Sequence, residues 1–209
     1  MQILLACSLG VWVFLSILYL VLLYKFRNII KDPEPKPGEP VAIRPSDTYS
    51  IFCSTRQELD EYLEMLLSSK YDGYKLTNFS RPGQMFAYEQ KRKPWNIFTS
   101  FHYYFVAYLE EFQEEDDGAI YSCANRFLRS HPTGFVFIKQ IRINYLIVVD
   151  RDSEPLRRYL NRRVDQLYQY YRLPAAICLE DQTLRIGREK DGYGIAQYHR
   201  LRKSLLKLF

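Results

Sequence analysis

The densest group of side chains with binding chemistry is a run of four arginines within seven residues: Arg157, Arg158, Arg162 and Arg163. A guanidinium group pairs with carboxylates and phosphates through two parallel hydrogen bonds. The run is therefore the first candidate surface for an acidic protein partner or for anionic lipid headgroups. The sequence leaves open the alternative that these arginines are exposed to water and pair locally with Asp152, Glu154 and Asp165.

A second basic group lies in the last seventeen residues, from Tyr193 to Phe209, which contain no acidic residue. Apolar residues such as Tyr198, Leu201 and Leu205 recur there at helical spacing and predict an amphipathic helix. The candidate binding residues on its polar side are Arg200, Arg202, Lys203 and Lys207. Such a helix lies on an anionic membrane or docks into a partner groove. Alternatively, it covers the domain's own sheet and leaves its bases in water.

A secondary candidate site combines three bases with an indole ring: Lys91, Arg92, Lys93 and Trp95. Basic residues beside an aromatic ring clamp phosphate-bearing ligands or sit at a lipid interface. The competing interpretation is a surface loop with its ring tucked into the core.

Motifs of catalysis and cofactor binding are absent from the sequence. It contains no G-x-S-x-G, Walker loop, dinucleotide fingerprint, H-E-x-x-H or paired C-x-x-C. Its three histidines, His102, His131 and His199, lack metal-ligand spacing. We therefore assign no catalytic residue, no metal and no cofactor. The four widely spaced cysteines predict free thiols in a reducing compartment.

The N-terminal region contains 22 uncharged residues, 3–24. A helix of this length spans ~33 Å, which matches the apolar thickness of a bilayer. No base precedes the run, which is also longer than the apolar part of a signal peptide. It therefore predicts an integral, single-pass anchor over residues 1–31, including its basic flank. Because Lys25, Arg27 and Lys31 follow the run, we expect the N-terminus outside and the C-terminal domain in the cytoplasm or facing a matrix.

Residues 32–45 contain five prolines and predict a semi-rigid linker, followed by one domain over residues 46–209. Thr55 and Glu58 form a capping box that begins a helix ending near Lys70. Pro82-Gly83 predicts a turn between strands at 74–79 and 85–90.

The second half of the domain is harder to interpret. Residues 97–112 fit a helix or a strand, and their β-branched and ring content favours the strand. The acidic run 110–117 reads as a solvated loop, and 135–149 as a central strand. A long helix is expected from Ser153 to Tyr171. Together these elements predict an α+β fold with a mainly antiparallel sheet and about three packed helices.

The net charge is +5, and six of the 24 acids lie between Glu110 and Asp117, so the rest of the chain favours an anionic partner. Our first hypothesis is a membrane-anchored, non-catalytic subunit or adaptor of a membrane assembly, which binds through its basic helices. The alternative is a membrane-tethered enzyme for a phosphate-containing or lipid substrate. Nucleic-acid binding ranks below both. A cavity with buried ionisable groups would favour the enzyme, and a core filled with rings the adaptor.

Overall fold

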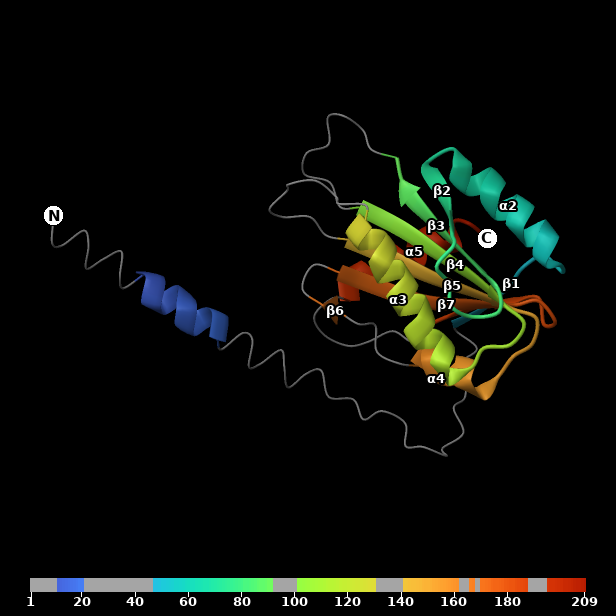
Figure 1. Cartoon of the computed structure of the whole chain (residues 1–209). Coiled ribbons are helices and arrows are strands. Elements are labelled where there is room, and N and C mark those ends of the chain that lie inside the picture. Colours follow the sequence, from blue (N-terminus) through green and yellow to red (C-terminus); the bar gives the residue numbers. More distant parts are fainter. Residues whose placement is uncertain are drawn as a thin grey trace, which may run out of the picture.

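The computed structural model describes residues 11–20, 47–91, 101–130, 141–161, 166–167, 170–187 and 195–209. Seven strands form a continuous sheet in the order β1-β8-β7-β5-β4-β3-β2, and the short β6 pairs with β7 off this path (Figure 1). The strands are β1 (Thr48–Ser50), β2 (Tyr71–Leu76), β3 (Gln84–Gln90), β4 (Phe101–Leu109), β5 (Ile141–Val149), β6 (Gln166–Leu167), β7 (Tyr170–Cys178) and β8 (Thr183–Ile186). The described helices are residues 11–20, α2 (Arg56–Ser68), α3 (Glu114–Ser130), α4 (Glu154–Asn161) and α5 (Ile195–Leu206).

The centre of the sheet is parallel. β4 pairs with β5 and β5 with β7 in parallel, whereas all other strand pairings are antiparallel. Parallel neighbours need a crossover connection, and the chain passes through α3 between β4 and β5 and through α4 between β5 and β7. The predicted α+β fold with a mainly antiparallel sheet and about three helices is therefore wrong. The domain is a mixed α/β domain with a seven-strand sheet.

Helices cover both faces of this sheet, so the domain has three layers (Figure 1). α3 and α4 pack on one face through Ile120, Phe127 and Leu156. α2 and α5 pack on the other face through residues such as Leu63 and Leu201. Because apolar residues fill both faces of the central strands, those strands read in the sequence as nearly continuous apolar runs.

The start of α3 explains one error of the sequence interpretation. The acidic run was expected to be a loop, but Glu114 to Asp117 form the first turn of this helix. Negative side chains stabilise a helix N-terminus because they face the positive end of its dipole. Asp116 is buried and its Oδ2 accepts a hydrogen bond from the backbone N–H of Gln113 at 2.7 Å. The acids therefore begin the crossover helix that makes β4 and β5 parallel.

The helix predicted from Ser153 to Tyr171 is also shorter than expected. α4 ends at Asn161, and β7 begins at Tyr170. Pairing of β7 with β5 buries Leu173 and Ile177 in the sheet. The apolar burial gained in the central sheet outweighs the helical spacing seen in the sequence.

Two other local predictions are confirmed. β2 and β3 form an antiparallel hairpin, and its connection contains Pro82-Gly83 as predicted, although the first strand is Tyr71–Leu76 rather than 74–79. Gly83 has φ of 140°, and a Cβ there would lie 2.2 Å from the carbonyl oxygen of Tyr108, so only glycine fits. The ambiguous segment 97–112 contains the strand β4, as its ring content favoured.

The structure corrects the prediction of a membrane anchor. Among the residues that the structure describes, no helix combines the length and apolar composition needed to cross a bilayer. The predicted span at 3–24, and with it the single-pass integral membrane localisation, is therefore wrong. The linker at 32–45 lies outside the described residues.

Helix α2 begins with the predicted capping box. The hydroxyl of Thr55 accepts a hydrogen bond from the Glu58 N–H at 3.2 Å, and Oε2 of Glu58 accepts from the Thr55 N–H at 3.3 Å. The same carboxylate accepts from the Ser54 N–H at 2.9 Å. The side chains of Thr55 and Glu58 therefore fix the residue at which α2 begins.

We expect Thr55→Ala to lower the free energy of unfolding by about 1 kcal/mol, because it leaves a backbone donor of α2 without its partner. Urea denaturation followed by circular dichroism measures this change. Thr55→Ser keeps the hydroxyl and serves as the control. Equal stabilities of the alanine and serine variants would show that the cap does not hold the helix.

Candidate functional site

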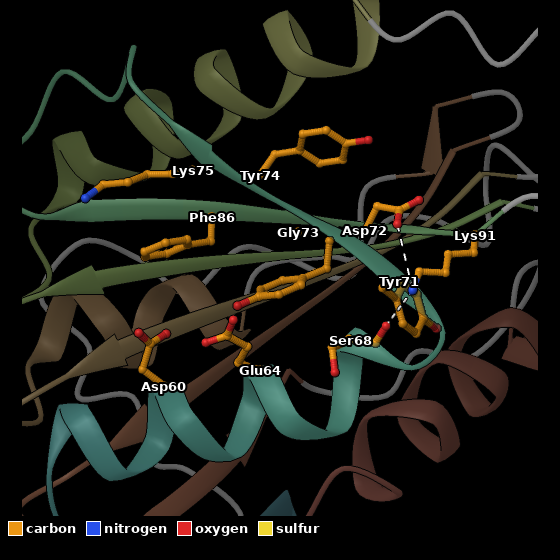
Figure 2. Close-up of a pocket in the computed structure, with 11 residues that line it drawn as sticks. Asp60, Glu64, Ser68, Tyr71, Asp72, Gly73, Tyr74, Lys75, Phe86 and Lys91 are labelled. Atoms are coloured by element: carbon orange, nitrogen blue, oxygen red, sulfur yellow. Dashed lines mark hydrogen bonds and ion pairs between the residues drawn. The ribbon is translucent and has the colours of Figure 1, made fainter.

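A pocket of about 550 Å³ opens between α2 and the β2–β3 hairpin, and we call it the α2 pocket (Figure 2). Its lining residues come from three consecutive elements and the residue after them: Asp60, Glu64, Ser68, Tyr71, Asp72, Gly73, Tyr74, Lys75, Phe86, Tyr88 and Lys91. Volumes of ~300–1,000 Å³ are usual for small-ligand sites. The α2 pocket is therefore large enough for a small molecule or one long side chain.

Two carboxylates form the α2 side of this pocket. Asp60 and Glu64 lie one turn apart on α2 and project toward the hairpin (Figure 2). The hydroxyl of Tyr108, on β4, donates a hydrogen bond to Oδ1 of Asp60 at 3.0 Å. Within the part of the chain that the structure describes, neither carboxylate has a lysine or arginine within ion-pair distance. The two negative charges face the pocket without a cation.

The phenol of Tyr88 lies beside these carboxylates. Tyr88 is 7% exposed, and its ring packs against Gly73, where an added Cβ would lie 3.3 Å from Cε1. Burial and the negative charges of Asp60 and Glu64 raise the pKa of Tyr88 to about 12. The hydroxyl therefore stays protonated at neutral pH, and it has no hydrogen-bond partner among the described residues. The same causes, burial first and then Asp60, raise the pKa of Tyr108.

Two lysines border the pocket. Nζ of Lys91 donates to the backbone carbonyl of Ser68 at 2.7 Å and lies 3.9 Å from a carboxylate oxygen of Asp72 (Figure 2). Nζ of Lys75 lies 5.9 Å from the centroid of the Phe86 ring, within the range of a cation–π contact. Lys91 is thus held by protein groups, whereas Lys75 lies over an aromatic wall.

Of the site residues predicted from the sequence, only Lys91 lines this pocket. Lys91 belongs to the secondary basic-aromatic site, while Arg92, Lys93 and Trp95 lie outside the described residues. Asp60 and Glu64 lie on the polar face of the helix expected after Thr55, and this face alone predicts only solvent exposure. The spacing of the two acids was visible, but their role depends on where the hairpin packs, which sequence spacing does not specify.

The arginine run on α4 is paired locally where the structure describes it. Arg157 donates from Nε to Asp152 at 2.7 Å. Arg158 donates to Glu154 at 2.7 Å and lies 3.7 Å from Glu114. The alternative that the sequence left open, local pairing, thus describes Arg157 and Arg158. Arg162 and Arg163 lie outside the described residues.

The basic residues of α5 have a different environment. Arg200, Lys203 and Lys207 are exposed, and no described carboxylate lies within ion-pair distance of any of them. Arg202 instead turns inward, where it donates to the hydroxyl of Tyr49 and lies 3.7 Å from Asp47. We call Arg200 and Lys203, together with Lys207 directly after the end of α5, the α5 basic face. Three of the four predicted residues therefore share one exposed surface.

A third polar group, centred on the partly buried His102, lies between the sheet and α5. Nδ1 of His102 lies 2.9 Å from the hydroxyl of Tyr71, and Nε2 lies 3.0 Å from Nδ2 of Asn144 and 3.5 Å from Oγ of Ser204. Burial, and then the positive charge of Arg142, lower the pKa of His102 to about 3. His102 is therefore neutral at physiological pH.

The described residues give no site for a metal ion. No group of three His, Cys, Asp or Glu side chains in this part of the chain is arranged to hold one. Cys53, Cys123 and Cys178 are free thiols, and the last two are buried. Burial raises the pKa of both buried thiols, which keeps them protonated.

Comparison of the chain with protein-family models, curated proteins and solved structures finds no match. Its function must therefore be argued from its own side chains.

Proposed function

We propose that this chain is a non-catalytic adaptor domain that binds an acidic protein surface through the α5 basic face. The observation that supports this proposal is the group of three exposed cations without a carboxylate partner among the described residues. The arginines of α4 contribute less, because Arg157 and Arg158 already bind carboxylates of their own domain. The partner-binding role thus belongs mainly to α5.

The position of α5 favours recognition by charge. Its apolar side is occupied by the domain's own sheet, since Tyr198, Leu201 and Leu205 are buried there. The hydroxyl of Tyr198 also donates to the carbonyl of Gly187 at 3.0 Å. These three apolar side chains are therefore not available to insert into a groove of a partner. It holds its basic residues on a fixed support.

Neighbouring positive charge strengthens this surface. The pKa of Arg142 is lowered by burial and by the nearby charge of Arg200. The side chain of Arg142 is held by Gln197, whose Oε1 accepts from its Nε at 3.0 Å. An acidic partner would relieve the repulsion between the two arginines. Since exposed ion pairs contribute ~0.2–1 kcal/mol each and are screened by salt, binding should be salt-sensitive.

The packing of the core favours an adaptor over an enzyme. Tyr103, Tyr104, Phe105 and Phe112 are each at most 2% exposed and fill the centre of the domain. This matches the ring-filled core that the sequence hypothesis associated with an adaptor. The carboxylates of the α2 pocket are partly exposed rather than buried.

The double charge reversal Arg200→Glu with Lys203→Glu should weaken binding to an acidic partner by at least about tenfold, which corresponds to ~1.4 kcal/mol. Retention of the full chain on an immobilised glutamate-rich peptide at about 0.05 and about 0.2 M salt measures this loss and its salt dependence.

The matched control is Arg126→Glu with Arg129→Glu. These two exposed arginines have the same three-residue spacing on α3, on the opposite face of the sheet. The control changes the net charge equally. If both double variants lose retention to the same extent, net charge alone explains binding and the proposed surface is wrong.

A further inference from the structure

We infer that the α2 pocket is a second binding site, which takes a ligand group with one positive charge, a guanidinium or a primary ammonium. This site lies between α2 and the β2–β3 hairpin, and the proposed adaptor surface does not use it. Its chemistry is also opposite, because its α2 side carries unpaired carboxylates.

The charge of the pocket gives the first argument. Like charges four residues apart on a helix repel each other, and Asp60 and Glu64 face the same cavity. The hydrogen bond from Tyr108 fixes the carboxylate of Asp60 in this position. A bound cation would relieve the repulsion and would donate charge-assisted hydrogen bonds to both carboxylates, which are stronger than hydrogen bonds between neutral groups.

The Tyr88 hydroxyl gives an independent second argument. This side chain is more than nine-tenths buried, lines the pocket and has no hydrogen-bond partner among the described residues. Its hydroxyl is therefore free to bond to a ligand in the pocket. Its pKa of about 12 reflects burial and the proximity of Asp60 and Glu64, so the hydroxyl and both carboxylates converge on one region. A ligand that binds the carboxylates can also bond to this oxygen.

The walls of the pocket define the shape and charge of the ligand. Phe86 and Tyr88 offer ring faces, and Lys75 already lies over Phe86 at 5.9 Å, so this ring is accessible to a cation. A planar guanidinium can stack on a ring while it bonds two carboxylates. The ammonium groups of Lys75 and Lys91 border the pocket and disfavour a second positive charge on the ligand.

A matched pair of probes tests the charge requirement. Isothermal titration calorimetry of the full chain with N-acetylarginine should give saturable binding. N-acetylcitrulline has nearly the same shape but a neutral urea group, and it should bind at least about tenfold more weakly, because it lacks the charge that pairs with Asp60 and Glu64. Equal binding of the two probes, or no saturable binding of N-acetylarginine at about 10 mM, would overturn the inference.

Variants locate the binding in the pocket. Glu64→Gln and Asp60→Asn should each weaken N-acetylarginine binding by about tenfold, and Tyr88→Phe by several-fold. Glu61→Gln is the control, since it makes the same charge change on α2 at a residue outside the lining. An equal effect of Glu61→Gln and Glu64→Gln would contradict the pocket. Arg200→Glu with Lys203→Glu should leave this binding unchanged, which separates it from the α5 basic face.

A third probe identifies the source of the cation. If acetyl-Gly-Arg-Gly-amide binds at least about tenfold more tightly than N-acetylarginine, the natural ligand is an arginine of a partner segment. If the two bind equally, the ligand is a free small molecule. In either case, Glu64→Gln should weaken binding of the probe by the same factor.

Discussion

Replacing Phe105 with alanine is expected to lower the free energy of unfolding by about 3–5 kcal/mol. Phe105 lies on the central strand β4 and is 1% exposed. Its ring stacks on Tyr145 at a centroid distance of 5.6 Å and meets the edge of Phe127 at 5.9 Å. The substitution removes apolar burial and leaves a cavity between β4, β5 and α3. Since whole domains are stable by only ~5–15 kcal/mol, the loss is severe.

Guanidinium denaturation followed by circular dichroism measures this loss, and Phe52→Ala provides the control. Phe52 is 97% exposed, so its removal should change stability by less than about 0.5 kcal/mol. The pair compares the same chemical change in a core and at a surface. A loss below about 1 kcal/mol in the Phe105 variant would show that the ring cluster does not hold the sheet to α3.

Local rules predicted those parts of the fold that depend on neighbouring residues. The capping box at Thr55 and the Pro82-Gly83 turn are set within four residues, and both are present in the structure. The strand at Phe101–Leu109 followed from its ring and β-branched content. These features need no knowledge of the rest of the chain.

The parallel centre of the sheet depended on long-range information. Whether the acids at 114–117 form a loop or a helix start decides whether β4 and β5 run parallel. The helical spacing that extended α4 toward Tyr171 competed with pairing of β7 to β5, and pairing prevailed. The anchor prediction at 3–24 rested on the length and composition of one local run, and no helix among the described residues is long and apolar enough to cross a membrane.

The candidate sites also combine features that the local sequence predicts with features that depend on long-range packing. The density of positive charge on α5 was visible in the sequence, and Arg200, Lys203 and Lys207 are exposed as expected. The inward turn of Arg202 toward Tyr49 was not, because that contact joins residues 153 positions apart. The α2 pocket was likewise not predictable, because Asp60 and Glu64 line a cavity only once the hairpin packs beside α2.

The partly buried His102 should make the stability of the domain depend on pH between about 5 and 7. In the folded domain its pKa is about 3, because burial and then the charge of Arg142 oppose protonation, whereas an unfolded chain has a histidine pKa of ~6.5. Below pH ~6.5 the unfolded state therefore binds a proton that the folded state does not. Stability is complete above this pH and falls as the pH decreases toward 3, by up to about 2 kcal/mol at pH 5.

The groups around His102 explain why the folded domain resists its protonation. Tyr71 bonds to Nδ1 and Asn144 to Nε2, while the ring centroid of Tyr104 lies 4.5 Å from that of the imidazole. The positive charge of Arg142 also opposes protonation. The polar contacts thus satisfy a neutral ring, and its hydrogen-bond partners Tyr71, Asn144 and Ser204 carry no carboxylate that would stabilise an added proton.

Urea denaturation of the full chain at pH 7, 6 and 5 measures the effect. His102→Gln keeps an amide for hydrogen bonding but cannot titrate, so it should be less stable at pH 7 and should lose most of the fall between pH 7 and pH 5. His199→Gln, at an exposed position on α5, should retain the fall seen in the unaltered chain. If the unaltered chain and His102→Gln lose stability in parallel, His102 is protonated in the folded domain and its neutral, buried state is excluded.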